Sequence, residues 1–173
     1  GGGGRGEADR VRPRGLCVVP TRELALQVQR VVTLCASAGR QKTKAKALSI
    51  YGGVDRSAQS SMLLRARAGR RPLFVVATPG RLLDFVREGL VVLDRLLFLV
   101  VDEADKLFHK GLYEQMEDIR QAAKRCRPRP QVMMVTATLT TPLRKERERW
   151  LRGGGRLVDL TEGEMRAEGE GDE

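Results

Sequence analysis

The sequence predicts an α/β domain with a mainly parallel sheet flanked by helices, and three features indicate this fold. Short apolar runs alternate with longer amphipathic segments, the order that is typical of strands and helices in such domains. The run LLFLVV at 96–101 is apolar at every position, as expected for a strand that is covered on both faces of a parallel sheet. A length of 173 residues with 41% hydrophobic residues suits one domain with its own core.

In the first half of the chain, strands are expected at 15–19, 45–51 and 72–77, and helices at 23–38 and 55–68. The first helix carries apolar residues at helical spacing, which we expect to face the core: Leu24, Val28, Val31, Leu34 and Cys35. Gly39 is expected to end this helix. The glycine pair 52–53 ends the second strand, and Asp55 stands near the start of the second helix.

In the second half, strands are expected at 96–101, 131–135 and 156–160, and helices at 80–89, 113–126 and 141–152. Pro142 suits the first turn of the last helix. The basic run RCRPRP at 125–130 is interpreted as the loop before the strand at 131–135. Residues 1–13 are expected to form a Gly/Arg-rich loop or linker, and 161–173 an acidic, disordered tail.

The charge balance indicates a basic domain. The formal net charge is +10, and the last thirteen residues hold six acids and one base, so residues 1–160 carry +15. Such a domain attracts polyanions, most often nucleic acid, although an Arg-rich surface that only keeps the protein dissolved would look the same. Aromatic residues make up 4% of the chain, so the core is expected to be aliphatic.

The cysteines exclude two classes of protein. Cys17, Cys35 and Cys126 are odd in number and no two have CxxC spacing, which excludes a disulfide framework and a zinc site. Cys17 and Cys35 lie in apolar runs and are expected in the core, and a reducing compartment fits this pattern. The longest apolar run is too short for a transmembrane helix.

Four polar motifs follow four of the expected strands. They are PTRELA (20–25), TPGR (78–81), DEAD (102–105) and TAT (136–138). If the strands are parallel, all four lie at the carboxyl-end edge of the sheet, where ligands bind in open α/β folds. Acidic residues can also simply begin a helix, but four such motifs on one edge favour a site.

The residue types in these motifs suit phosphate chemistry. Asp102 is the first carboxylate after its strand and a natural anchor for Mg²⁺, which takes one or two carboxylates plus waters and phosphate oxygens. Glu103 can polarise a water for attack on phosphorus. Threonines and backbone N–H groups at helix starts can bind phosphate oxygens, and Arg22 and Arg81 add positive charge. This arrangement suits a sugar–phosphate backbone more than bases.

Together PTRELA, the glycine pair, TPGR, VDEAD and TAT resemble the DEAD-box RNA helicases in order and spacing, over residues 14–160. The resemblance implies most of the first of two RecA-like domains, in a protein that couples ATP binding and hydrolysis to local unwinding of RNA duplexes. It implies ATP and Mg²⁺ as cofactors and RNA as partner, bound with little sequence specificity.

The resemblance also implies roles for single residues. Asp102 would hold Mg²⁺ through water, and Glu103 would position the hydrolytic water. Thr136 and Thr138 would couple the nucleotide site to RNA through contacts with the DEAD segment, including Asp105. Thr136 stands where the family usually has Ser, which keeps the hydroxyl. The RNA path would be lined by Pro20, Thr21, Arg22, Gly53, Thr78, Pro79, Gly80 and Arg81.

One family motif does not occur in these 173 residues. The phosphate-binding pattern G-x-x-x-x-G-K-[ST] is absent, and ASAGRQKT at 36–43 lacks both glycines. We therefore expect a fragment whose missing strand leaves an open hydrophobic face, so that the isolated chain folds poorly and hydrolyses ATP negligibly. A non-catalytic RNA-binding or scaffolding remnant and a DNA helicase of the same superfamily are the alternatives. The intact DEAD and TAT segments favour the helicase.

Overall fold

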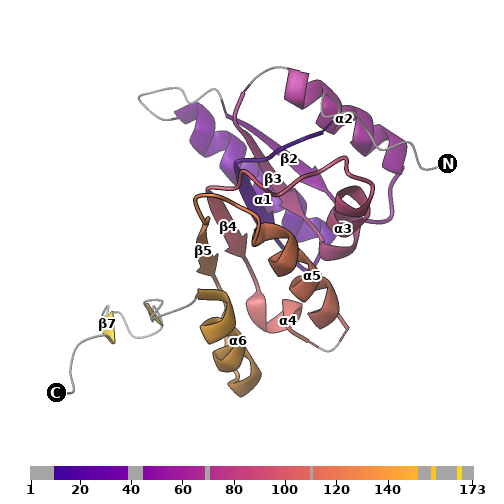
Figure 1. Ribbon diagram of the computed structural model, residues 1–173. Helices are drawn as coiled ribbons and strands as arrows, with labels where there is room; N and C mark the ends of the chain where they lie inside the picture. Colours follow the sequence, from indigo (N-terminus) through magenta and orange to yellow (C-terminus); the bar gives the residue numbers. More distant parts are fainter. Residues whose placement is uncertain are drawn as a thin grey trace.

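A five-stranded sheet of parallel strands, in the order β2-β3-β1-β4-β5, forms the centre of the molecule (Figure 1). The structure is a computed structural model that describes residues 10–38, 45–68, 71–109, 111–151, 157–158 and 167–168. The strands are β1 (Gly15–Val18), β2 (Lys46–Ile50), β3 (Leu73–Ala77), β4 (Phe98–Val101) and β5 (Gln131–Met134). The predicted fold class, a parallel sheet flanked by helices, is confirmed.

Six helices surround this sheet in the described part of the chain (Figure 1). They are α1 (Arg22–Ala38), α2 (Arg56–Ala68), α3 (Pro79–Arg87), α4 (Ala104–Leu107), α5 (Tyr113–Ala123) and α6 (Thr141–Leu151). Five of them match predicted helices to within a few residues. The single-turn helix α4 was not predicted, because four residues are too few to show a helical period.

One face of the sheet is covered by α3 and α5. Leu16 and Val18 of β1 and Leu99 of β4 are buried there, beneath Phe85 of α3 and Ile119 of α5. The core is mainly aliphatic, as predicted. Phe85 is a fully buried ring within it, and Phe108 and Trp150 meet edge to face.

The opposite face is covered over only part of its width. There α1 packs mainly on β2 and β3, and Ala25 is buried in one cluster with Cys17 and Val76. On β4 and β5 the same face is open, so Phe98 is 50% exposed and Met133 51% exposed. The prediction that LLFLVV is buried on both faces is therefore wrong for one face, because no described helix lies over β4 and β5 on that side.

The second half of α1 also departs from the prediction. Val31 and Leu34 are largely exposed, and so is Cys35, which was expected in the core. Their helical spacing places these residues close to the side of α1 that faces the sheet. However, mainly the first turns of α1 pack against the sheet, so the later residues stay exposed. Cys17 is buried, as predicted.

Ordered structure begins before the predicted boundary at residue 14. Val11 is buried and forms a parallel bridge with Val91, through Val11 N–H to Leu90 O at 2.7 Å and Val92 N–H to Val11 O at 2.9 Å. Residues 10–13 are therefore part of the fold, and 1–9 of the expected linker lie outside the described residues.

The last strand, expected at 156–160, does not pair as the predicted parallel sheet would require. Residues Leu157–Val158 (β6) pair antiparallel with Ala167–Glu168 (β7) and do not join the parallel sheet. The remainder of the expected strand at 156–160 and of the tail at 161–173 lies outside the described residues.

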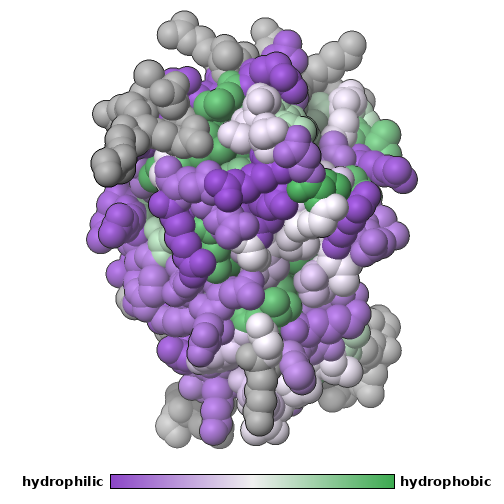
Figure 2. Space-filling view, turned by 90° about the vertical axis from the view of Figure 1, so that its right-hand side faces the viewer, coloured by the Kyte–Doolittle hydropathy of each residue, from purple (hydrophilic) through white to green (hydrophobic). Residues whose placement is uncertain are grey.

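The surface on the side of α2 and α3 is mostly hydrophilic. Figure 2 shows small apolar patches separated by polar side chains on this face. No helix in the described ranges is long and apolar enough to cross a membrane.

Candidate functional site

The polar motifs lie side by side along the carboxyl-end edge of the sheet. Backbone hydrogen bonds extend the ladders into them: Thr78 N–H donates to Ile50 O at 3.1 Å, and Asp102 N–H donates to Val18 O at 3.0 Å. At the far strand, Ala104 N–H donates to Val135 O at 2.9 Å. The structure therefore brings the segments after all five strands to one edge, as the sequence predicts for parallel strands.

Glu103 has an unusual backbone conformation at this edge. Its φ and ψ of 49° and 51° are left-handed, and among the described residues it is the one non-glycine with positive φ. Such a conformation costs about 1–3 kcal/mol and is common at functional sites. Its N–H donates to Oδ1 of Asp102 at 2.9 Å, and its carboxylate pairs with Lys106 at 2.9 Å. The turn thus places two consecutive carboxylates outside the sheet.

The DEAD and TAT segments are joined by a hydrogen bond. The hydroxyl of Thr138 donates to Oδ2 of Asp105 at 2.6 Å, and the hydroxyl of Thr136 donates to Thr138 O at 2.9 Å. The Thr138 hydroxyl is the main cause that lowers the pKa of Asp105 below its ordinary value of 3.8. The contact is the one that the resemblance implies, while the coupling role of these threonines stays a prediction.

The surroundings of Asp102 set limits on metal binding. In the described ranges, no three His, Cys, Asp or Glu side chains form a set that could hold a metal ion. Asp102 is half-buried, and its Oδ1 accepts the hydrogen bond from Glu103 N–H. A single carboxylate with a spare oxygen fits Mg²⁺ only where phosphate oxygens and waters complete the shell. The residues present therefore fit a metal that arrives with a nucleotide.

Cys17 lies buried close to Asp102. Burial, and secondly the charge of Asp102, raise the pKa of the Cys17 thiol to about 12. The thiol is therefore protonated at neutral pH, and a protonated thiol is a poor nucleophile. It contributes apolar packing beneath the edge.

The PTRE segment begins α1. The hydroxyl of Thr21 accepts a hydrogen bond from Leu24 N–H at 3.2 Å, which caps the helix. Arg22 is exposed, and its guanidinium lies over the Tyr51 ring at 5.1 Å from the centroid. Pro20 is half-buried at the strand end. An exposed cation beside a helix N-terminus suits an anionic ligand.

Arg81 of the TPGR segment is engaged by the protein itself. Its side chain is 10% exposed, and its guanidinium donates to Gln59 Oε1 at 2.8 Å and to Val54 O at 3.1 Å. Arg81 therefore ties α3 to the loop after β2, which contains Gly53 with φ of 79°. The prediction that Arg81 contacts a phosphate is untested, and the geometry gives it a positioning role.

The other TPGR residues begin α3. Thr78 precedes the helix with extended backbone, Pro79 stands at its first position, and Gly80 is exposed. Gly80 leaves the backbone of this first turn uncovered by a side chain, so a ligand can approach the N–H groups there closely.

Gln59 was not predicted at this site. Gln59 is buried, accepts from Arg81, and donates to Tyr51 O at 3.2 Å. The available signal was the position of Gln59, a polar residue on the side of an amphipathic helix that faces the core.

Comparison with known proteins gives consistent matches. The model of the DEAD/DEAH box helicase family matches residues 7–145. The chain is 38% identical to ATP-dependent RNA helicase DBP3 of Debaryomyces hansenii, over 75% of this chain and 22% of that protein. It is 36% identical to ATP-dependent RNA helicase DbpA of Bacillus subtilis, over 79% and 26%.

A solved structure shares the fold. The crystal structure of the yeast DEAD-box splicing factor Prp28 matches with a TM-score of 0.66 and 29% identity, over 81% of this chain and 31% of that one. The sheet with its flanking helices is therefore RecA-like. The chain spans about a quarter of the length of the curated relatives that it matches.

Proposed function

Because this chain belongs to the DEAD/DEAH box helicase family, we propose that it forms most of the first RecA-like domain of an ATP-dependent RNA helicase. In this proposal the carboxyl-end edge of the sheet couples ATP hydrolysis to local separation of RNA strands. The relatives are named ATP-dependent RNA helicases, and the activity is extended from them to this chain.

The observation that carries the proposal is the contact between the segments after β4 and β5. Glu103 is held out from the strand by a left-handed backbone, and two residues later Asp105 is bonded to Thr138 at 2.6 Å. Through this hydrogen bond, a change at the carboxylates would reach the TAT segment directly. Carboxylates that only begin a helix would need neither the strained backbone nor this contact.

The nucleotide would be ATP with Mg²⁺. When bound, the metal ion neutralises charge on the phosphates. Asp102 would hold it through water, and Glu103 would orient and deprotonate the attacking water. The phosphate-binding loop that this chemistry requires does not occur in these 173 residues, so we propose negligible ATP hydrolysis for the isolated chain.

RNA would lie along the first three strand ends. Thr21, Arg22 and the exposed Gly80 offer hydroxyl, guanidinium and backbone donors at two helix starts. Pro20, Thr78 and Pro79 shape these starts, and Arg81 holds the loop that contains Gly53. Such donors bind phosphates and do not read bases, which agrees with binding of little sequence specificity.

The test begins with the transcript. Sequencing it across both ends of residues 1–173 identifies the natural product, whose ATPase and duplex unwinding are then measured with and without RNA. The proposal expects an upstream G-x-x-x-x-G-K-[ST] in frame and ATPase that rises with RNA.

Two results would decide against the proposal. A product with no such motif that binds RNA without turnover would favour the non-catalytic RNA-binding remnant. A product stimulated by DNA and not by RNA would favour the DNA helicase.

A further inference from the structure

The amino-end edge of the sheet, opposite the candidate site, carries one cation near the start of every strand. In the sheet order β2-β3-β1-β4-β5 these are Lys46, Arg71, Arg14, Arg95 and Arg129. All five side chains are exposed. Because neighbouring strands lie about 4.8 Å apart, the row extends over roughly 19 Å.

Carboxylates are scarce on this edge. The segments 10–14, 45–46, 71–72, 92–97 and 124–130 together contain ten Lys or Arg and one acid, Asp94. Asp94 is already paired with Arg12 at 3.2 Å. Within the described ranges, the five cations of the row and Arg125 and Arg127 form no ion pair. Their charge is therefore available to an external anion.

A hollow lies within this edge. It has a volume of about 190 Å³ and is lined by Arg14, Arg95, Leu96, Leu97, Arg127 and Pro128. Pockets for drug-sized ligands measure about 300–1,000 Å³, so this one suits a single phosphate group or one nucleotide unit. The lining combines three arginines with two leucines and a proline, a composition that suits an anion with an apolar neighbour.

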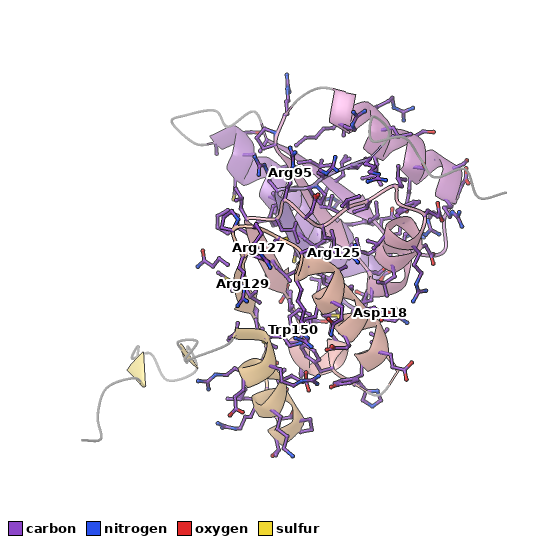
Figure 3. All side chains as sticks on the ribbon, viewed as in Figure 1. Arg95, Asp118, Arg125, Arg127, Arg129 and Trp150 are labelled. Carbon is purple, nitrogen blue, oxygen red and sulfur yellow. The ribbon has the colours of Figure 1, made fainter. Side chains whose placement is uncertain are left out.

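The loop between α5 and β5 supplies the densest part of the row. Cys126 is fully buried, whereas Arg125, Arg127 and Arg129 on either side of it are exposed. Arg127 is held in place, because its Nη1 donates to Lys124 O at 2.9 Å and to Cys126 O at 2.8 Å. Figure 3 shows Arg95 and these three arginines on one side of the molecule, around this loop.

We propose that this amino-edge row binds the phosphate backbone of an RNA strand, as a second contact separate from the carboxyl-end site. Arginine predominates in the row, and two N–H groups of a guanidinium can bind two phosphate oxygens at once. Arg127 uses Nη1 within the protein, and its other N–H groups can still donate to a phosphate. Repeated cations suit a ligand with repeated charges. Protein–protein interfaces usually contain aromatic side chains at their centre. The five segments contain no aromatic residue, which favours RNA over a protein partner.

The first test measures binding of a labelled single-stranded RNA to the whole chain by fluorescence anisotropy. The variant Arg125→Gln/Arg127→Gln/Arg129→Gln is compared with Arg30→Gln/Arg144→Gln/Lys145→Gln, which removes equal charge from exposed positions on α1 and α6. We expect the first variant to bind roughly tenfold more weakly and to lower the slope of log K against log salt by about 2. We expect less than about a twofold change in the second. Equal weakening in both would reject a specific site.

A second measurement uses the unaltered chain, so it does not depend on the folding of a variant. RNA containing 4-thiouridine is cross-linked by light, and the attached peptides are identified. Cross-links at 95–97 and 125–130 support the proposal. Cross-links confined to 20–25 and 78–81 would overturn it and leave the proposed function intact.

An acidic protein is the competing occupant. A polyglutamate peptide is titrated against the same variants. If the loop variant loses affinity for this peptide but keeps its affinity for RNA, the row is a protein-docking surface and the RNA proposal is wrong. Loss of RNA binding in Arg22→Gln alone, with the loop variant unaffected, would likewise reject the second contact while favouring the carboxyl-end site.

Discussion

The two edges of the sheet differ in the signs of their charges. At the carboxyl end, the segments 19–22, 51–55, 78–81, 102–106 and 135–140 contain three Lys or Arg and four acids. At the amino end, the five segments that precede the strands contain ten Lys or Arg and one acid. A mixed edge can hold a cation, orient water and bind phosphate. An edge of one sign can attract a polyanion but offers no general base.

The mixed edge also has more internal bonding. Asp102, Glu103 and Asp105 each have a hydrogen-bond or ion-pair partner within the protein. Arg12 of the amino edge pairs with Asp94, whereas the hydrogen bonds of Arg14 and Arg127 go only to backbone carbonyls. At the mixed edge, where we propose hydrolysis, internal bonds hold the carboxylates in place. At the amino edge, where we propose only RNA binding, the side chains can adapt to the ligand.

The largest expected effect concerns the thiol beneath the mixed edge. Cys17, whose pKa is raised to about 12, should react with Ellman's reagent at pH 8 at least about 10³-fold more slowly than the exposed Cys35. Stopped-flow absorbance measures both phases. The variant Cys35→Ser/Cys126→Ser, in which Cys17 is the one remaining thiol, should lose the fast phase, and a fast phase that survived would show that Cys17 is accessible and this edge wrongly placed.

The next effect concerns hydrolysis. In the natural product, Glu103→Gln should slow ATP turnover by at least ~10²-fold, the lower range for removal of a general base, while ATP and RNA binding are retained. A steady-state ATPase assay measures the change. Glu148→Gln, on the exposed face of α6, is the matched control. Unchanged turnover in Glu103→Gln would remove Glu103 from the proposed role.

A smaller effect is expected on stability. Arg81→Gln removes buried bonds to Gln59 and Val54 and should lower the free energy of unfolding by about 1–3 kcal/mol. Arg87→Gln, in the same helix but in an exposed pair with Asp118, should lower it by less than about 1 kcal/mol. Urea denaturation compares them. Equal losses would mean that Arg81 is as weakly engaged as a surface residue.

The smallest expected effect is on pH dependence. Because the folded pKa of Asp105 lies below its ordinary value of 3.8, its contribution to stability is present above 3.8 and is lost as pH falls through the folded pKa. Thr138→Val removes the main cause of this shift, so the melting temperature of the variant should fall less steeply below pH 4. Parallel curves for the variant and the parent would show that the hydrogen bond does not stabilise the charged carboxylate.

The sequence was sufficient to predict the parallel sheet and the edge that carries the four polar motifs. Apolar runs of four to six residues that end in PTRE, TPGR, DEAD and TAT identify the strands and the side on which their chains emerge. This inference needs only that the strands be parallel. The hydrogen bond between Asp105 and Thr138 could be anticipated only through the family resemblance.

Burial was harder to predict, because it depends on which helix covers which strand. Phe98 and Leu34 are apolar and periodic, yet both are exposed, since nothing in the described ranges packs over them. Arg81 is a cation in a polar motif at the start of a helix, yet its side chain is nearly buried. Hydropathy patterns report a preference for burial and do not show whether a partner is present.

The cations of the amino edge are visible in the sequence, where RCRPRP was interpreted only as the loop before the strand at 131–135. Arg14, Arg95 and Arg129 each stand one to three residues before an apolar run. Their alignment becomes evident only when β1, β4 and β5 are known to be neighbours.

The central claim is that the mixed edge couples hydrolysis to strand separation through Asp105 and Thr138. The most direct measurement is the number of RNA duplexes separated per ATP hydrolysed by the natural product, for Thr138→Val and for Thr138→Ser. We predict that Thr138→Val lowers this ratio by roughly tenfold, as loss of a hydrogen bond to a charged group implies, and that Thr138→Ser, which keeps the hydroxyl, restores it. A ratio unchanged in Thr138→Val would contradict the account.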